Sequence, residues 1–582
     1  MKKIYFIFIL PLITLIGSFL LRAASGPFWQ YGDPPYNYIF NAYQIVKGHS
    51  PTEVGHPGTP LQVFIAFTIW IFNLGRSSAD AVNQALINPE FYLWAVFIFL
   101  VLAAFVTSSL LAYFVYRKTN DKLAAILSQV PGLSFLIMPC FDNGSFPVLP
   151  VVANVSAEPV FIIIMNLFNL FVLGLYFAEN KSQELRFLLF LAFICGLGLA
   201  TKINFLIILL TALMIVPLRK KPLFFIACAA SFVFCTIPII PRYPLLFSWI
   251  TDIVNHSSRY GSGDQKFIDW GSFVFYLKLM FHADWFFILT AIAMWTWSTI
   301  RLFSLRQDRD LRFIWTLSLW CLIDMAATAK HFSFHYLLPC FGLFSSIFVL
   351  FYLNQKERHQ LSKPLAAIFI LVFTCVCIFY AIPYGQRLKV LTDDIHQFND
   401  TVNTKYPQCT VIPSTTGDID FFLTNQEVMQ RSNGTAFRLE SEDLYRLYPH
   451  NYYFFSEEVT SPDPTVESYG IWNYKERVYA DDILNSCPCT IFIKYASDLS
   501  EYPFQVRSIE HSKFLNAYLL TGSTEKEANY LFAKALEAFK KGNYQEALAL
   551  GLKSRELNYE PRRQLEYILT IIYHDLMNSK RA

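Results

Sequence analysis

Charged residues are scarce in this chain of 582 residues: Asp, Glu, Lys and Arg make up 16% of it, whereas hydrophobic residues make up 54%. A water-soluble protein of this length cannot bury so large a share of apolar surface. The apolar excess lies before residue 385, and the rest has the composition of an ordinary soluble protein. The shortage of charge therefore excludes a globular cytosolic enzyme. It predicts an all-α polytopic membrane protein followed by a soluble C-terminal region.

A signal-peptide cleavage site is lacking as well. Residues 1–22 have a basic start at Lys2 and Lys3 and a long apolar stretch, but no clear small-x-small site precedes the next membrane sequence. We therefore expect this stretch to be retained as the first membrane helix.

Long apolar stretches predict about eleven membrane helices, because a bilayer core of ~30 Å takes about 20 helical residues. The stretches run over 4–22, 91–116, 122–139, 158–178, 186–201, 203–218, 222–241, 284–303, 312–328, 336–353 and 364–384. The first long loop, 23–90, contains two weaker candidates at 36–46 and 61–74. The first is amphipathic at helical spacing, and we interpret it as a helix at the membrane interface. The second is more apolar, and it would lie in the interface or dip into the membrane.

Lys and Arg predict the orientation. They concentrate in the short connections that share a side with the N-terminus, such as 117–122, 219–221 and 301–312. Basic loops stay in the cytoplasm. We therefore expect a bacterial inner-membrane protein with a cytoplasmic N-terminus and an extracytoplasmic region after residue 384.

Several ionisable and tyrosine side chains fall on the predicted outer side, in segments far apart in the chain. They are Asp33, His56, Glu158, Lys202, His256, Arg259, Tyr260, Lys330, His331 and Tyr336. Ionisable groups at membrane depth are costly and usually functional, so one cavity that opens outward is the simplest hypothesis. Simpler roles remain open: Asp33 would start a turn, Glu158 would stabilise a helix N-terminus, and Lys202 would reach the headgroups.

The order and common side of these motifs resemble integral membrane glycosyltransferases of the GT-C class. This class includes the protein O-mannosyltransferases and the aminoarabinose transferase that modifies lipid A. The resemblance covers roughly residues 1–385. It rests on Asp33 in the first loop, the Pro-rich segment 56–60, Glu158 at the start of the fourth span, and the segments 196–202 and 329–339.

The resemblance implies transfer of a sugar from a polyprenyl-phosphate donor to a glycan, lipid or protein acceptor at the outer face, with inversion. Asp33 would be the base that deprotonates the acceptor. Many relatives have a second carboxylate directly after this Asp, but here Pro34 takes that place. Glu158 is therefore expected to share the role of base with Asp33. The implied donor-phosphate ligands are Lys202, Lys330 and Arg259. The implied substrate-positioning residues are His56, His256, Tyr260, His331 and Tyr336.

No cofactor is expected from this chemistry, because lysines can neutralise a leaving group that carries one phosphate. A divalent metal remains compatible with it, but the sequence gives no support for one. Two other classes stay open. A transporter or flippase would use a buried charge such as Asp324, although no internal repeat is visible. A ligase or polymerase of preassembled glycans would use basic residues of a late outer loop.

The C-terminal region divides in two by its sequence pattern. Residues 385–522 alternate short apolar segments with turn clusters, which predicts a soluble α/β domain. Residues 523–582 resemble one tetratricopeptide repeat, with small residues at Ala535 and Ala547, and offer a surface for a protein partner. If this region is extracytoplasmic, we expect one disulfide among Cys409, Cys487 and Cys489.

Overall fold

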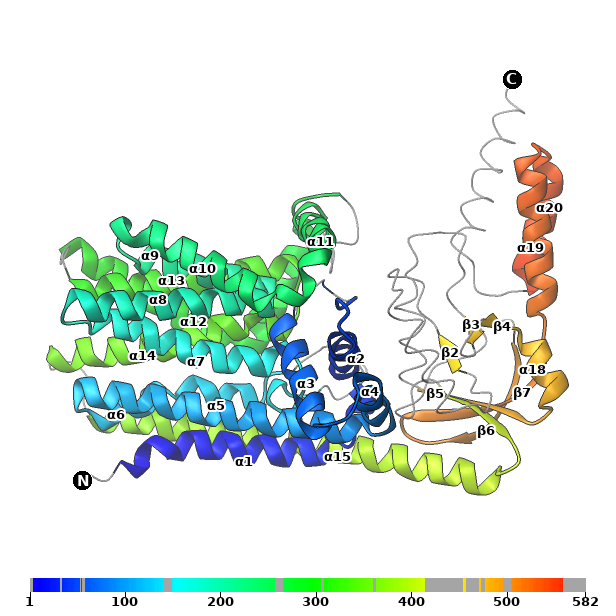
Figure 1. Cartoon of the computed structure of the whole chain (residues 1–582), viewed down its shortest axis with the longest axis horizontal. Helices are drawn as coiled ribbons and strands as arrows, with labels where there is room; N and C mark the ends of the chain where they lie inside the picture. Colours follow the sequence, from blue (N-terminus) through cyan, green and yellow to red (C-terminus); the bar gives the residue numbers. More distant parts are fainter. Residues whose placement is uncertain are drawn as a thin grey trace. The chain divides into compact units, whose positions relative to one another are not determined.

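A computed structural model describes residues 4–31, 34–52, 54, 58–139, 149–256, 265–304, 308–358, 363–413, 454–456, 470–472, 477–495 and 504–557. The chain divides into two compact units, Met1–Lys389 and Val390–Ala582. The described part of the first unit is built from helices, and every described β-strand belongs to the second (Figure 1).

Long apolar helices form the bulk of the first unit and lie alongside one another (Figure 1). Among the described residues, eight helices are long and apolar enough to cross a membrane, or nine if one bent pair counts as a span. The eight spans lie in η1 (Tyr5–Phe8) with α1 (Ile9–Ala24), α5 (Pro89–Thr119), α7 (Ala157–Tyr176), α8 (Lys181–Thr201), α12 (Trp270–Ser304), α13 (Arg309–Lys330), η9 (Phe334–Leu337) with α14 (Leu338–Glu357), and α15 (Lys363–Lys405). The chain is therefore an integral membrane protein, as its composition predicts.

Shorter elements fill the remaining predicted stretches. They are α6 (Lys122–Leu127) with the 3₁₀ helix η3 (Val130–Leu136), η5 (Ile203–Phe205) with α9 (Leu206–Ile215), and α10 (Lys221–Cys235). The prediction of one straight span over 222–241 is wrong. Pro238 and Pro241 break the helix after Cys235. The next helical segment, η7 (Ile237–Arg242) with α11 (Tyr243–Asn255), is bent by 85° relative to α10. Proline removes a helical hydrogen bond and clashes with the preceding turn.

Ion pairs tie several helix ends together at one end of the bundle. Lys118 pairs with Glu179, Lys220 with Glu184, Lys356 with Asp121 and Arg358 with Asp308, at 2.7 to 2.9 Å. We call this the basic end. Burial raises the pKa of Asp121, but the Lys356 ammonium and the amides of Ala124 and Leu123 outweigh it, so the pKa lies below its ordinary value.

The opposite end of the bundle holds the other termini of the same helices. Here the Arg22 guanidinium, at the end of α1, donates to the carbonyl of Ala153 in η4 (Val151–Ala153). Lys202, after α8, pairs with Glu158 at the start of α7. Within the described residues the chain therefore runs back and forth between the two ends, through α1, α5, α6 with η3, α7, α8, η5 with α9, α10, α12, α13, α14 and α15. Eight of these segments, or nine with the bent pair, are long enough to span a membrane, fewer than the eleven or so predicted.

The long connection between α1 and α5 contributes helices to this second end. They are α2 (Pro35–Val46), α3 (Thr59–Phe72) and α4 (Ser78–Ile87), which gather at one end of the bundle (Figure 1). The predicted helices at 36–46 and 61–74 are confirmed as α2 and α3. The apolar side chains of Phe67, Trp70 and Phe72 on α3 are exposed, as a helix in contact with lipid requires.

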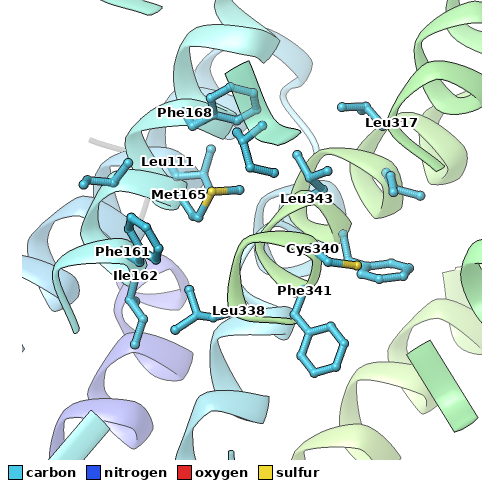
Figure 2. Packing of buried hydrophobic residues seen from close by; sticks show 14 of the residues in the cluster. Leu111, Phe161, Ile162, Met165, Phe168, Leu317, Leu338, Cys340, Phe341 and Leu343 are labelled. Carbon is cyan, nitrogen blue, oxygen red and sulfur yellow. The ribbon is translucent and has the colours of Figure 1, made fainter. Parts of the chain in front are cut away.

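Helices α7 and α14 pack closely through the core of the bundle (Figure 2). A Cβ atom added at Gly342 would lie 2.8 Å from the Cβ of Met165, so only glycine allows this approach. The Asn169 amide then donates to the Gly342 carbonyl at 2.9 Å, and the Ser346 hydroxyl donates to the Asn169 oxygen at 2.5 Å. This contact fixes the start of α7 beside the segment that precedes α14.

The second unit contains a four-stranded sheet with the order β1-β5-β7-β6. Its strands are β1 (Thr410–Pro413), β5 (Thr490–Tyr495), β6 (Phe504–His511) and β7 (Leu515–Ser523). The β1–β5 pair is parallel and the others are antiparallel. Helix α18 (Ala480–Ser486) covers a small core that includes Ile412, Phe492 and Leu520. The predicted α/β character of this region is confirmed.

Short strands and a helical hairpin complete the second unit. Strands β2 (Phe454–Ser456), β3 (Gly470–Trp472) and β4 (Arg477–Val478) form a separate antiparallel sheet. Helices α19 (Glu525–Lys540) and α20 (Tyr544–Leu557) pair across a turn at Gly542, whose φ of +79° favours glycine. Ala535 and Ala547 are buried in them, as the repeat pattern predicts.

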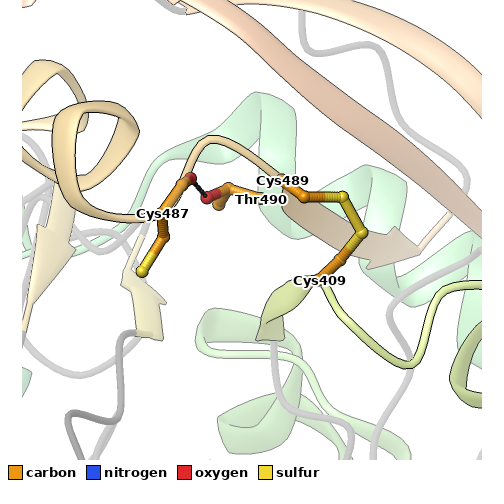
Figure 3. The surroundings of a disulfide bond; sticks show 4 residues. All are labelled: Cys409, Cys487, Cys489 and Thr490. Atoms are coloured by element: carbon orange, nitrogen blue, oxygen red, sulfur yellow. Dashed lines mark hydrogen bonds between the residues drawn. A yellow bond between two sulfur atoms is a disulfide. The ribbon is translucent and has the colours of Figure 1, made fainter.

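A disulfide joins Cys409 to Cys489 (Figure 3). The two residues directly precede β1 and β5, whose parallel pairing aligns Thr410 with Thr490. Cys487 remains a free thiol. The prediction of one disulfide among the three soluble cysteines is therefore confirmed, and strand pairing selects the partners.

Replacing Cys409 by Ser is expected to destabilise the second unit by about 2–5 kcal/mol, because the bond closes a loop between residues 80 apart. The measurement is resistance of the C-terminal region to trypsin in membrane vesicles as urea increases. Cys487→Ser is the matched control and leaves resistance unchanged. Equal resistance in the two variants would show that the Cys409–Cys489 bond does not stabilise this unit.

Candidate functional site

Glu158 and Lys202 form a buried ion pair where α7 begins and α8 ends. The Lys202 Nζ donates to the Glu158 Oε1 at 2.6 Å, and the two side chains are 6% and 3% exposed. The two helices are antiparallel neighbours, so the first turn of one meets the last residue of the other. A carboxylate at a helix N-terminus and a cation at a helix C-terminus are also the arrangement that helix dipoles favour.

Two glycines let α8 end in this position. A Cβ at Gly196 would lie 2.5 Å from the carbonyl oxygen of Cys228 on α10. A Cβ at Gly198 would lie 2.5 Å from the ring of Phe205, where the chain turns back through η5. The segment 196–202 is therefore glycine-rich for packing reasons, and this packing places Lys202 beside α7.

His335 and Tyr336 complete the cluster from the segment before α14, within η9 (Phe334–Leu337). The His335 Nε2 lies 3.7 Å from the Glu158 Oε1, and its Nδ1 is bonded to the Ser333 hydroxyl at 2.8 Å. The Lys202 ammonium lies 4.6 Å from the centre of the Tyr336 ring. We call Glu158, Lys202, His335 and Tyr336 the Glu158 cluster.

A cavity of about 250 Å³ adjoins this cluster, and Lys202 and Tyr336 belong to both. Its other polar lining residues are Asn204, Asp324, Thr328 and His331. Apolar side chains of α9 and α11, among them Ile207, Ile250 and Val254, line the rest. The cavity thus joins a cationic group to an apolar wall.

Lys330, His331 and His256 gather around the C-terminal end of α11. The Lys330 Nζ donates to the carbonyls of Ile253 and Val254 at 3.0 and 2.7 Å, and the His331 Nε2 is bonded to the Ile253 carbonyl at 2.9 Å. The His256 ring is bonded to the Asp252 carbonyl. Cations commonly stabilise the last carbonyls of a helix in this way. The roles predicted for the three residues in substrate binding stay predictions.

Asp33, His56, Arg259 and Tyr260 lie outside the described residues, so their predicted roles stay predictions too. The chain on either side of the first two is described. The Glu90 carboxylate accepts from the amides of Phe28 and Trp29 at 2.9 and 3.0 Å and from the Tyr36 hydroxyl at 3.0 Å. It therefore ties together the segments before and after Asp33.

Gly58 bonds to the residue before Lys202. Its amide donates to the carbonyl of Thr201 at 3.0 Å. Its φ is +55°, and an added Cβ would lie 2.4 Å from the Tyr38 ring of α2, so glycine is required on both counts. The start of α3 is thus fixed next to Lys202.

Sequence patterns missed the role of His335. They drew attention to His331, which lies directly after Lys330, but the structure places His335 against Glu158. His335 was visible in the sequence among the polar residues before the tenth predicted span, but no role in the site was predicted for it. Among the described residues, no group of three or more His, Cys, Asp or Glu side chains is arranged to hold a metal ion.

Comparisons with known proteins are sparse. No family model and no curated protein sequence matches the chain. Among solved structures, the crystal structure of ArnT from Cupriavidus metallidurans bound to undecaprenyl phosphate is similar over 88% of this chain and 97% of that chain. The identity is 10% and the TM-score is 0.43. At these values the resemblance assigns no activity to the chain.

Proposed function

We propose that this protein is a membrane glycosyltransferase that moves a sugar from a polyprenyl-phosphate donor to an acceptor at the end of the bundle that holds the Glu158 cluster. The observation that carries the proposal is the place of Lys202, between a buried carboxylate and a cavity with an apolar wall. A polyprenyl phosphate combines an anionic head with a long apolar chain. The cavity offers a partner for each part.

Lys202 is the proposed ligand of the donor phosphate. An ammonium has three donors, and Glu158 takes one of them. As the bond between the sugar and the phosphate breaks, negative charge grows on the leaving phosphate, and a cation held in a dry site stabilises that charge strongly. Two further cations are proposed to assist. Lys330 is the last residue of α13 and bonds to the end of α11. Arg259 belongs to the segment that follows α11 in the sequence.

Asp33 is the proposed base, and Glu158 keeps Lys202 charged and in position. The acceptor oxygen forms a bond to the anomeric carbon, the bond from that carbon to the phosphate oxygen breaks, and the acceptor proton passes to the carboxylate. Polyprenyl phosphate leaves. A single displacement of this kind inverts the anomeric centre. It takes no redox cofactor, and we propose that it takes no metal.

The orientation follows from the distribution of Lys and Arg. The basic end collects the connections rich in these residues, so we propose that it faces the cytoplasm. The Glu158 cluster then faces the outside of a bacterial inner membrane. The acceptor is a glycan, a lipid or a protein, and α19 with α20 offers a surface for a protein partner.

The test is donor-dependent labelling of membranes that contain or lack the protein. Polyprenyl phosphate that carries a radiolabelled sugar is added, and the extract is separated into lipid, glycan and protein fractions. The proposal expects label in one fraction only when the protein is present, with release of polyprenyl phosphate. Equal labelling with and without the protein, across a panel of sugars, would refute it.

A transporter or flippase is the second candidate, and Asp324 favours it. This carboxylate is 1% exposed within a membrane helix and lines the cavity. Buried acids of this kind often serve as proton relays. A transporter would move a fluorescent polyprenyl-phosphate lipid across proteoliposomes without forming a covalent product, whereas the proposed enzyme would form one.

A further inference from the structure

Asp324 and Asn204 supply unpaired polar atoms to the wall of the cavity that contains Lys202. Asp324 lies on α13 and is 1% exposed, and its Oδ2 has no hydrogen-bond partner among the described residues. Asn204 lies in η5, and both its side-chain oxygen and its nitrogen are buried, again with no partner in the described part of the chain.

Buried polar atoms without a hydrogen-bond partner lower the stability of the folded protein. A buried polar group without a partner destabilises a protein by roughly 1–3 kcal/mol, and an ionisable group within a membrane helix adds to this cost. Asp324 and Asn204 come from elements 120 residues apart in the chain but line one cavity. A ligand that fills the cavity and bonds both would remove the cost.

The rest of α13 provides a contrast. Ser318 is fully buried, and its Oγ also has no partner among the described residues, but it does not line the cavity. Thr328 follows Asp324 by one helical turn, so the two share a face, and it does line the cavity. Polar groups from two elements thus converge on the cavity itself.

We propose that Asp324 and Asn204 form a subsite for the hydroxyl groups of the glycosyl part of the donor; the proposal rests on the proposed function. A carboxyl group accepts hydrogen bonds, and a carboxamide both donates and accepts them. Sugar hydroxyls match both. The polarity of Asp324 and Asn204 disfavours the isoprenoid chain at this position, whereas the phosphate is better matched by the Lys202 ammonium. Lys202 therefore takes the phosphate, and Asp324 with Asn204 takes the sugar.

Such a subsite makes Asp324 and Asn204 specificity residues. A site built to bond hydroxyl groups rejects ligands that lack them, because its own polar atoms would remain unpaired. We therefore expect the full-length protein to bind a glycosylated polyprenyl phosphate more tightly than the bare lipid phosphate, and we expect the difference to depend on Asp324.

The experiment measures dissociation constants for the purified full-length protein in lipid nanodiscs. The probes are undecaprenyl phosphate alone and the same lipid carrying glucose, mannose, arabinose or N-acetylglucosamine. The wild type should bind at least one glycosylated probe ten-fold or more tightly than the bare lipid. Asp324→Ala, Asp324→Leu and Asn204→Leu should reduce that preference at least five-fold and leave binding of the bare lipid unchanged. Ser318→Ala is the control and should keep both affinities.

The outcomes separate this inference from the proposed function. If the wild type binds the bare lipid but no glycosylated probe more tightly, or if the Asp324 variants keep the preference, the subsite is refuted and the phosphate site stands. If the wild type binds none of the probes, the proposed function fails and the subsite fails with it. Asp324→Ala removes the carboxyl group without adding bulk, so it decides the matter if the leucine variant does not fold.

Discussion

Lys202→Gln is expected to lower sugar transfer from a polyprenyl-phosphate donor by about 10²–10³-fold, the usual effect of removing one group that stabilises developing charge. The side chain is buried and its ammonium lies 2.6 Å from Glu158, so no water can substitute fully for it. The measurement is the initial rate of label transfer in vesicles with matched amounts of protein. Lys202→Arg keeps the charge and should retain more activity than Lys202→Gln.

A structural effect of the same variant must be separated from the catalytic one. Removing Lys202 leaves the Glu158 carboxylate buried without its cation, which is strongly destabilising. The double variant Glu158→Gln with Lys202→Gln removes both charges, so we expect it to recover folded protein but not transfer. Full transfer by the folded double variant would exclude Lys202 as the phosphate ligand.

Lys118→Gln is the matched control for this experiment. Lys118 also pairs with a glutamate, Glu179, but at the basic end, where the glutamate side chain is 72% exposed. Exposed pairs of this kind contribute about 0–1 kcal/mol, so both folding and transfer should remain close to wild type. Loss of transfer in this variant would point to a general effect of charge removal.

The sequence predicts the bundle well because its two strongest signals are physical requirements of a membrane. A helix that spans the membrane needs a long apolar stretch, and Lys and Arg concentrate in the loops on the cytoplasmic side of a membrane protein. The same signals fail at 222–241, where apolar residues continue across Pro238 and Pro241 although the helix does not. Hydrophobicity measures transfer into lipid and is insensitive to the missing backbone hydrogen bonds that bend the chain by 85°.

The members of the candidate site were easier to predict than their partners. Glu158 and Lys202 were both predicted from the sequence, but as a residue that shares the role of base and as a phosphate ligand rather than as one ion pair. Their contact depends on α7 and α8 lying antiparallel, which a single sequence does not reveal. Likewise, only the turn after α13 decides that His335 faces Glu158 while His331 bonds to α11.

The disulfide shows the same limit in a simpler case. Three cysteines in the soluble region allow three pairings. Cys487 and Cys489 are only two residues apart, and neither is favoured by sequence. The parallel pairing of β1 and β5 brings Cys409 next to Cys489, and this long-range contact selects the bond. Local patterns thus identify reactive groups, whereas tertiary contacts choose among them.

Asp33→Asn is expected to lower the rate of transfer by about 10²–10⁴-fold, the range for loss of a general base. Glu90 bonds to Phe28 and Tyr36, which precede and follow Asp33 in the sequence, and the Gly58 amide bonds to the carbonyl of Thr201 beside Lys202. Asparagine keeps the size of the side chain but cannot accept the acceptor proton. The loss should therefore appear in the maximal rate and not in donor affinity.

Asp80→Asn is the control for this last variant, because Asp80 lies in the same long connection between α1 and α5 but is exposed, and among the described residues it bonds to Ser77, the residue before α4. It should transfer sugar at the wild-type rate. If Asp33→Asn transfers sugar at the wild-type rate, Asp33 is not the base, and Glu158 becomes the candidate for that role. In that case Glu158→Gln, with Lys202 intact, should stop transfer while the bare lipid phosphate still binds, since the two carboxylates are the candidates that the chemistry allows.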